Sequence, residues 1–349
     1  MEREATIGVL VVEDSAVIRG LITRGIESDP AIRVVGSAGD GLAALALLET
    51  LAPQIVLLDV EMPVMDGLAA LPRILAKRPG AAVIMASALT HRHAAMSLKA
   101  LQLGAADYVR KPDAGEGPAA RAAFFEELKL KIKTLAGAKA KRPVEQPRAR
   151  PAAPTPVSYS ALAIGSSTGG PPALVKVFAR ARGGLKAPVF VTQHMPATFT
   201  ALLAEQLGQV AGVQACEGAE GQIVQPATIY VAPGGRHMLA ERSAEGVVIR
   251  LSDAPPEHFC KPAVDPMLRS LAKVYGAGLL GVVLTGMGRD GADGCIAVAE
   301  AGGRFITQDE ATSVVYGMPQ AAYRTGRALA QLPLEEIGGF LFNAAGRRL

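Results

Sequence analysis

Short apolar runs alternate with amphipathic segments along the first 135 residues. In the amphipathic segments, apolar residues recur three or four positions apart, which is the spacing of one helix face. The runs that predict strands are 8–12, 32–38, 55–58, 82–86 and 108–109, and clear helices between them are 16–27, 41–51 and 65–76. Five short strands that alternate with helices predict a (βα)5 domain with a doubly wound parallel sheet, whose functional site lies at the carboxyl ends of the strands.

The same alternation resumes after residue 158. Apolar runs that predict strands lie at 162–164, 189–193, 279–284 and 304–306. A less regular stretch over 213–251 interrupts them and predicts an antiparallel section. We therefore expect a second α/β domain that is doubly wound and mostly parallel.

A stretch rich in proline and alanine separates the two halves. Residues 136–157 contain five prolines and five basic residues, with Glu145 as the only acid. Such a composition buries too little apolar surface to fold and predicts a semi-extended spacer. The sequence thus predicts one domain over residues 1–135, a linker over 136–157 and a second domain over 158–349.

Composition narrows the classes of function. The chain has 349 residues, 50% of them hydrophobic, and no tryptophan, so aliphatic residues must form both cores. The formal net charge is only +4, and much of the basic excess lies in the predicted linker, which argues against a nucleic-acid partner. The three cysteines are widely scattered, as expected in the reducing cytoplasm. Without a signal-peptide pattern or a bilayer-length apolar run, a cytoplasmic protein with no membrane insertion is expected.

Charged side chains follow three strands of the first predicted domain. Glu13 and Asp14 follow the first strand, Asp59 follows the third and Lys111 follows the last. Because the carboxyl ends of parallel strands meet at one edge of a sheet, these carboxylates should converge, and they suit a hard cation such as Mg2+. Each residue alone also fits a helix cap or a solvated charge. Their shared position, with Ser87 at the end of the fourth strand, favours a site.

Four separated motifs in this half occur in a recognisable order. They are Val11-Val12-Glu13-Asp14, the stretch 57–67, Met85-Ala86-Ser87-Ala88 and Val109-Arg110-Lys111-Pro112. On these motifs, residues 7–135 resemble the receiver domain of response regulators. The resemblance implies that Asp59 accepts a phosphoryl group from a histidine kinase, while Ser87 and Lys111 contact the phosphate.

The resemblance also implies a metal site. Mg2+ would be held by Asp14, Asp59 and the carbonyl of Glu61, with Glu13 close by. The metal and a lysine ammonium can stabilise charge on phosphoryl oxygens during transfer.

A serine in a glycine-rich turn follows the first strand of the second half. Ser167 lies in Gly165-Ser166-Ser167-Thr168-Gly169-Gly170-Pro171-Pro172, and proline is favoured at the first position of a helix. Such a turn presents a nucleophilic hydroxyl at a helix N-terminus. The same residues also suit a plain strand-to-helix turn, and the turn alone does not decide between them.

Two further strand ends supply the partners that a nucleophilic serine needs. His194 directly follows the strand at 189–193, and Asp290 lies in the loop after 279–284. A hydroxyl, an imidazole and a carboxylate at three strand ends predict a Ser-His-Asp triad. His237 and His258 remain alternative bases, although both lie in irregular segments.

Five segments of the second half carry another resemblance. They are 164–170, 192–196, 230–234, 284–291 and 317–319. On these segments, residues 158–341 resemble the catalytic domain of the CheB family of chemotaxis methylesterases. The resemblance implies Ser167 as nucleophile, His194 as general base and Asp290 as the group that orients it. The backbone N–H groups of Thr168 and Met287 would bind the oxyanion.

A receiver, a linker and this domain in that order imply a phosphorylation-activated esterase of a two-component chemotaxis system. The expected reactions are demethylation of glutamate methyl esters and deamidation of glutamines on methyl-accepting chemoreceptors, with a chemotaxis histidine kinase as phosphodonor. The esterase reaction is expected to need no cofactor. Two segments depart from the family pattern: Arg289 replaces an asparagine, and Phe259-Cys260-Lys261 replaces Arg-His-Arg.

Two other functions are weighed against the esterase. The turn at 165–170 could bind phosphate, but it lacks the lysine of a P-loop and the glycine spacing of a dinucleotide site. The second domain could instead be a non-catalytic output module that binds a protein. The three triad residue types at three strand ends favour the enzyme.

Overall fold

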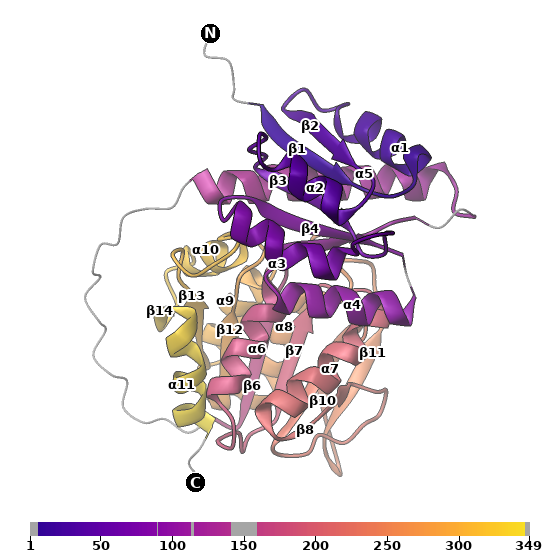
Figure 1. Ribbon diagram of the computed structural model, residues 1–349. Coiled ribbons are helices and arrows are strands. Elements are labelled where there is room, and N and C mark those ends of the chain that lie inside the picture. Colours follow the sequence, from indigo (N-terminus) through magenta and orange to yellow (C-terminus); the bar gives the residue numbers. More distant parts are fainter. Residues whose placement is uncertain (1–5, 89, 113–114, 141–158, 346–349) are drawn as a thin grey trace. The chain divides into compact units, whose positions relative to one another are not determined.

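The computed structural model describes residues 6–88, 90–112, 115–140 and 159–345 (Figure 1). The chain divides into two compact units, Met1–Arg142 and Pro143–Leu349. None of the helices that the structure describes is long and apolar enough to cross a membrane.

The N-terminal unit is built on a parallel sheet of five strands in the order β2-β1-β3-β4-β5. Its strands are β1 (Ile7–Val12), β2 (Ile32–Ala38), β3 (Ile55–Asp59), β4 (Ala82–Ser87) and β5 (Asp107–Arg110). Its helices are α1 (Ala16–Ile26), α2 (Gly41–Leu47), α3 (Gly67–Lys77), α4 (His91–Gln102) and α5 (Pro118–Ala140).

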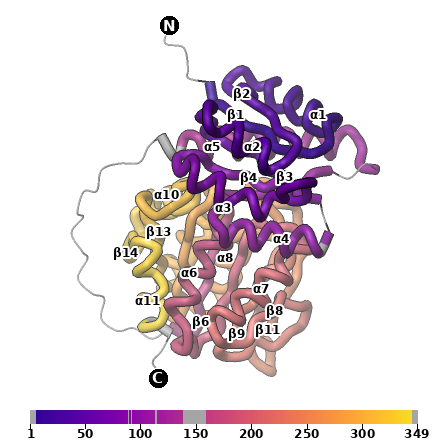
Figure 2. Tube along the Cα trace, in the orientation of Figure 1, coloured from indigo at the N-terminus to yellow at the C-terminus, as the bar shows by residue number. Residues whose placement is uncertain are grey.

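Right-handed crossovers divide these helices between the two faces of the sheet. The chain steps outward from β1 to β2 and then returns past β1 to β3, so α1 and α2 cover opposite faces. Accordingly α1 packs against α5, whereas α3 packs against α2 and α4 (Figure 2). Because helices cover both faces, every residue of β3 and β4 is buried. The fold class predicted for this half is confirmed.

The end of α5 differs from the predicted domain boundary. The helix continues to Ala140, so the first five residues of the predicted linker, 136–140, are helical. Alanine and lysine are strong helix formers and the first proline comes only at Pro143, which is why the helix extends this far. Residues 141–157 of the predicted linker lie outside the described residues.

The C-terminal unit contains a parallel sheet of seven strands in the order β14-β13-β12-β6-β7-β9-β8. The strands are β6 (Ala161–Ser166), β7 (Val189–Gln193), β8 (Gln214–Glu217), β9 (Thr228–Val231), β12 (Leu279–Val283), β13 (Arg304–Gln308) and β14 (Ala330–Leu332). The helices are α6 (Gly170–Arg180), α7 (Ala197–Ala211), α8 (Val264–Tyr275), α9 (Ala292–Glu300), α10 (Met318–Tyr323) and α11 (Leu334–Ala345), with a short 3-10 turn at Gly276–Gly278.

The strand order of this sheet reverses between β6 and β12. From β6 the chain adds β7 on one side, continues to the edge strand β8 and returns to β9 between β7 and β8, and it then crosses to β12 on the other side of β6. In open α/β sheets, the carboxyl ends of the strands at such a reversal border the binding crevice. The loops after β6 and β12 are therefore the expected walls of a site. The predicted doubly wound, mostly parallel fold is confirmed.

One part of the expectation for this half was wrong. The stretch 213–251 is not antiparallel throughout, because β8 and β9 join the main sheet in parallel, with β9 alongside β7. Only β10 (His237–Ser243) and β11 (Gly246–Ser252) form an antiparallel hairpin. A local apolar pattern specifies a strand but not its partner, and β9 finds its partner in a strand more than thirty residues earlier in the chain.

Candidate active site

Ser167 lies in the sharp turn between β6 and α6. Gly169 caps the helix with a φ of 75°, a conformation that glycine adopts without steric cost. The Gly170 N–H donates to the Ser167 carbonyl at 2.7 Å and closes the turn. The Ser167 side chain is half-buried at the end of the strand next to the reversal.

The loop after β12 is hydrogen-bonded to this turn. The Ser167 N–H donates to the Thr285 carbonyl at 3.0 Å, and the Thr285 hydroxyl donates to the Thr168 carbonyl at 2.9 Å. A Cβ atom on Gly286 would lie only 2.9 Å from Cβ of Ser167, so a larger residue does not fit there. Thr168 and Met287, the predicted oxyanion donors, thus belong to two loops that are hydrogen-bonded together. Their role stays a prediction.

Gln193 links the serine turn to the strand that carries His194. Its side-chain N–H group donates to the Ser167 carbonyl at 3.0 Å, and its oxygen accepts from the Ser166 hydroxyl at 2.7 Å. The side chain is almost wholly buried, so these hydrogen bonds replace those to water. Sequence reasoning missed Gln193, because a polar residue that ends a strand carries no signal of its own.

His194 and Asp290 form the hydrogen-bonded pair that the sequence predicts. Nε2 of His194 lies 2.8 Å from Oδ2 of Asp290. Asp290 is buried and also accepts from the backbone N–H groups of Val264 at 2.6 Å and Asp265 at 3.0 Å. Burial raises the pKa of Asp290, but the hydrogen bond and charge of His194 and the two N–H donors outweigh burial and lower the pKa below its ordinary value.

The side chain of Cys260 acts on the pKa of the His194 imidazole as well. Burial lowers the pKa of His194, but hydrogen bonds and charge from Asp290 and Cys260 outweigh it and raise the pKa to about 9. Among the described residues, no hydrogen bond joins the Ser167 hydroxyl to this imidazole. Hydrogen bonds between catalytic side chains are often long without substrate and tighten when substrate binds.

The segment Phe259-Cys260-Lys261, which departs from the family pattern, thus includes a residue that acts on the pKa of His194. Phe259 is fully exposed with a φ of 63°, and Lys261 donates to the carbonyls of Asp253 and Ala254 at 3.3 Å. Cys260, between them, contributes to the raised pKa of His194. The side chain of Arg289, the other departure, is exposed and pairs with Asp293 at 2.9 Å.

The alternative bases are occupied elsewhere. His237 is buried, with Nε2 donating to the Pro255 carbonyl at 3.0 Å and Nδ1 accepting from the Ala263 N–H at 3.1 Å. Both ring nitrogens are thus used to hold backbone. His258 binds Asp265 through Nε2 at 2.9 Å. Of the three histidines, His194 alone hydrogen-bonds Asp290 among the described residues.

The N-terminal unit gathers its acidic residues at the carboxyl edge of its sheet. Carboxylate oxygens of Glu13, Asp14 and Asp59 lie within 4.8 Å of one another. Nζ of Lys111 lies 2.8 Å from Oε2 of Glu13 and 2.8 Å from Oδ1 of Asp59. A compact set of carboxylate oxygens fits the ligand preference of Mg2+. The resemblance assigns the backbone carbonyl of Glu61 to the metal. The side chain of Glu61 lies close to those of Arg92 and His93 at the start of α4.

Charge pairing at this edge outweighs the cost of burial for the lysine. Burial lowers the pKa of Lys111, but the neighbouring carboxylates of Asp59 and Glu13 raise it above its ordinary value overall. Burial dominates for Glu13, whose pKa is raised in spite of Lys111. The ammonium therefore stays charged where a phosphoryl group on Asp59 would be formed.

Ser87 has a buried partner on α4. The Ser97 hydroxyl donates to the Ser87 hydroxyl at 2.9 Å, and both side chains are almost completely buried. The carbonyl of Ser87 accepts from the Lys111 N–H at 2.8 Å. Ser87 thus lies beside the acidic site, with its hydroxyl engaged by a helix.

An acidic receiver-type site followed by a parallel-sheet unit with a serine turn and a His-Asp pair defines a response regulator with an enzymatic output domain. The model of the CheB methylesterase family matches residues 162–341, and that of the response regulator receiver domain matches residues 9–118. The chain belongs to the CheB methylesterase family.

Individual relatives agree with this placement. A protein-glutamate methylesterase/protein-glutamine glutaminase of Paramagnetospirillum magneticum is 46% identical over 98% of this chain and 97% of its own length. A protein of the same name from Nitrobacter hamburgensis is 48% identical over 96% of this chain and 93% of its own length. The crystal structure of the Thermotoga maritima CheB methylesterase catalytic domain is similar with a TM-score of 0.51 and 36% identity, and covers 53% of this chain and 98% of that domain.

We predict that Gly170→Ala disturbs the serine turn. The new Cβ would lie 2.0 Å from Oε1 of Gln193, a buried side chain held by several hydrogen bonds. Displacing it should cost about 1–3 kcal/mol of unfolding free energy, because buried polar groups lose their partners. Thermal unfolding and the rate at which a fluorophosphonate labels Ser167 measure the effect, and both should fall.

Gly339→Ala is the matched control. Gly339 lies in α11 with no atom within 4 Å of the added Cβ, and alanine is the better helix former. Stability and labelling should be unchanged or slightly increased. Equal behaviour of the two variants would show that the turn tolerates the displacement.

Proposed function

We propose that the protein hydrolyses glutamate methyl esters, and deamidates glutamines, on methyl-accepting chemoreceptors by means of Ser167, His194 and Asp290. The observation that carries the proposal is the 2.8 Å His194–Asp290 pair, which lies beside the serine turn at the reversal of the sheet. The names of the relatives support the same pair of activities. A purely protein-binding output module would not need an ionised carboxylate buried against an imidazole.

The proposed reaction proceeds through an acyl-enzyme. Neutral His194 accepts the proton of Ser167 as its Oγ attacks the ester carbonyl, and the N–H groups of Thr168 and Met287 donate to the resulting oxyanion. His194 then returns the proton to the methoxide, which leaves as methanol. A water molecule, deprotonated by His194, attacks the acyl-enzyme and releases glutamate and the serine hydroxyl. With a glutamine amide, the leaving group is ammonia.

Asp290 holds the imidazole throughout this cycle. Its carboxylate accepts from Nε2 and thereby fixes the orientation of the ring. When His194 takes up a proton, the ring becomes a cation beside a buried anion, which stabilises the charge that develops in the transition state.

For the receiver we propose that Asp59 accepts a phosphoryl group from a chemotaxis histidine kinase. Asp14, Asp59 and the Glu61 carbonyl would hold Mg2+ with Glu13 close by, and Lys111 and Ser87 would contact the phosphate. The clustering of three carboxylates within 4.8 Å and the two 2.8 Å contacts of Lys111 support this assignment. Mg2+ supplies charge stabilisation to the transferring phosphoryl oxygens when bound. All three cysteines are free thiols, which agrees with a cytoplasmic protein.

We predict that the triad residues act as one unit. Ser167→Ala should abolish methanol release from methylated receptor membranes, and His194→Ala should be comparably severe, without further loss in the double variant. Asp290→Asn should lower the rate by up to about 10^4-fold, the loss known for the orienting carboxylate of a well-studied triad. Arg289→Asn is the neighbouring control and should have a mild effect, because that side chain is exposed. Near-normal turnover by Ser167→Ala would refute the triad.

We predict that ester hydrolysis rises with pH toward the pKa of His194, which is raised to about 9. Only the neutral imidazole can accept the serine proton, so the active fraction grows as pH rises through this value. Cys260→Ala removes one of the two groups that raise this pKa and should move the midpoint of the kcat profile to lower pH. Initial rates, corrected with Ser167→Ala for spontaneous ester hydrolysis, give the profile.

Cys216→Ala controls for loss of a thiol as such. Cys216 is half-buried on β8, where it accepts from the Gln222 side chain at 3.5 Å. The midpoint of this variant should match that of the unaltered chain. An unshifted midpoint in Cys260→Ala would show that the Cys260 thiol does not contribute to the pKa of His194.

We predict that phosphorylation of Asp59 activates the full chain. A receiver tethered by a linker is held at high local concentration beside the esterase, so a weak contact suffices to cover its site. A small phosphodonor with Mg2+ should raise methanol release by the full chain but not by Asp59→Ala, and the fragment 158–349 should be more active than the resting chain. An inactive but folded fragment, or equal activation of Asp59→Ala, would contradict inhibition by the receiver.

A further inference from the structure

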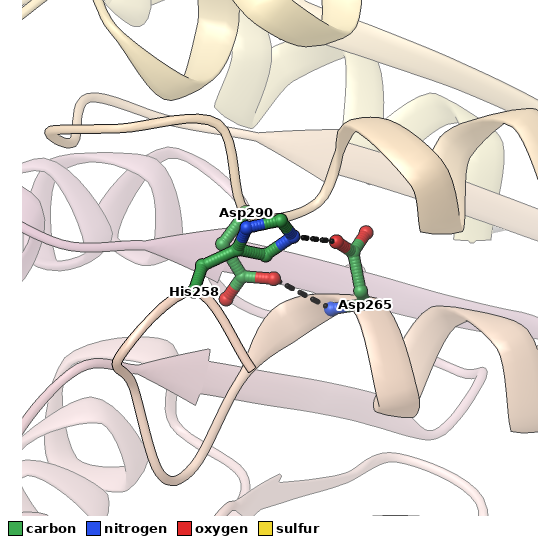
Figure 3. Close-up of side chains that lie close together, drawn as sticks. All are labelled: His258, Asp265 and Asp290. Carbon is green, nitrogen blue, oxygen red and sulfur yellow. Dashed lines mark hydrogen bonds and ion pairs between the residues drawn. The ribbon is translucent and has the colours of Figure 1, made fainter. Parts of the chain in front are cut away.

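A second histidine and a second carboxylate lie behind the proposed triad. His258, Asp265 and Asp290 offer side-chain atoms within 4.8 Å of one another. Figure 3 shows the His258 ring directed at the carboxylate of Asp265, while the backbone N–H of Asp265 points to the carboxylate of Asp290. Both carboxylates are buried, and the His258 side chain is 28% exposed.

The donors around these carboxylates argue against a metal site. Oδ1 of Asp290 accepts from Asp265 N, and Oδ2 accepts from Val264 N and His194 Nε2. Oδ1 of Asp265 accepts from Gly294 N at 2.5 Å, and Oδ2 binds His258 Nε2 at 2.9 Å. Every carboxylate oxygen is thus bound by an N–H group, and a cation would have to displace these donors. The cluster is built to hold its own side chains in place.

We propose that Asp265 and His258 are positioning residues for Asp290, because they fix the first turn of α8, whose N–H groups bind both oxygens of that carboxylate. This inference rests on the proposed triad. It assigns a function to a pair, the half-buried His258 and the buried Asp265, that the reaction itself does not use.

Asp265 connects three segments at this point. It lies in the first turn of α8, its carboxylate binds Gly294 in the first turn of α9, and it binds His258 in the preceding loop. Asp290 comes just before α9 along the chain and receives two N–H groups from α8. The Asp265 carboxylate therefore sets the distance between the helix that carries these donors and the segment that carries the acceptor.

His258 is the side-chain hydrogen-bond partner of the buried Asp265 carboxylate. Burial and the nearby charge of Asp290 raise the pKa of Asp265 to about 6, because two carboxylates share one buried region. Asp293 adds negative charge from α9, and the charge of Asp265 in turn helps to raise the pKa of the buried Cys295 thiol. His258 is the basic group within hydrogen-bond distance of Asp265 among the described residues. Its N–H group keeps the Asp265 carboxylate in the orientation that also binds Gly294.

A double-mutant cycle tests this inference. In the phosphodonor-activated full chain, Asp265→Ala should lower kcat for a glutamyl methyl ester peptide by about 10- to 100-fold. Losses of about this size are typical when a residue that orients a metal-binding side chain is replaced. KM should not change, because Asp265 does not touch the substrate. In an Asp290→Asn background the same substitution should cost little more, since it acts through Asp290. The same loss in both backgrounds, or a loss confined to KM, would overturn the proposal.

His258 variants provide a second readout should Asp265→Ala not fold. His258→Ala should lower kcat, and His258→Gln, which keeps an N–H donor, should recover most of the loss. Equal rates in the two variants would contradict a positioning role. Glu300→Gln is the matched control, because this exposed carboxylate at the end of α9 pairs with Arg327 and is not hydrogen-bonded to Asp265 or Asp290; its kcat should be unaltered.

The two proposals fail in different ways. Full activity in Asp290→Asn would refute the triad and the positioning role with it. A different outcome is that Asp290→Asn lowers kcat and that Asp265→Ala lowers it further by the same factor as in the unaltered chain. That outcome would leave the triad intact and refute the positioning role alone.

Discussion

A negative charge buried beneath the carboxyl ends of a parallel sheet is the constraint on which the catalytic domain depends. The Asp290 side chain is about as inaccessible as the aliphatic core, and an unpaired carboxylate there would cost several kcal/mol. Three N–H donors offset this cost, and two of them come from the N-terminal turn of α8, whose dipole favours an anion. The position of α8, the loop after β12 and the imidazole of His194 are consequently coupled through one side chain.

Much of this arrangement follows from local pattern alone. Ser167, His194 and the loop of Asp290 each come directly after an apolar strand, and a parallel sheet brings such positions to one edge whatever the details of packing. The same reasoning locates Asp59 and Lys111. The predicted strands accordingly overlap the observed ones, and the errors are at boundaries that depend on neighbours, such as the end of α5.

The rest of the site depends on contacts that no local pattern contains. Gln193 ends a strand and Asp265 opens a helix, and neither position requires its side chain to bind a residue 26 or 29 positions away. In the sequence, Cys260 is distinguished only as a departure from a family motif, and its effect on the pKa of His194 depends on how the loop is folded. The partners of strands could not be predicted for the same reason, since β8 and β9 have the pattern of any short strand but join the parallel sheet.

The hydroxyl pair formed by Ser87 and Ser97 has a consequence for the balance between the resting and the rearranged receiver. Because both groups are buried, turning Ser87 toward a phosphoryl group on Asp59 leaves the Ser97 hydroxyl without its present partner in the interior. An unsatisfied buried hydroxyl costs about 1–3 kcal/mol, which corresponds to a bias of roughly 5- to 150-fold against the turned state. The Ser87–Ser97 hydrogen bond therefore favours the resting arrangement, and any repacking that turns Ser87 must give the Ser97 hydroxyl another partner to avoid this cost.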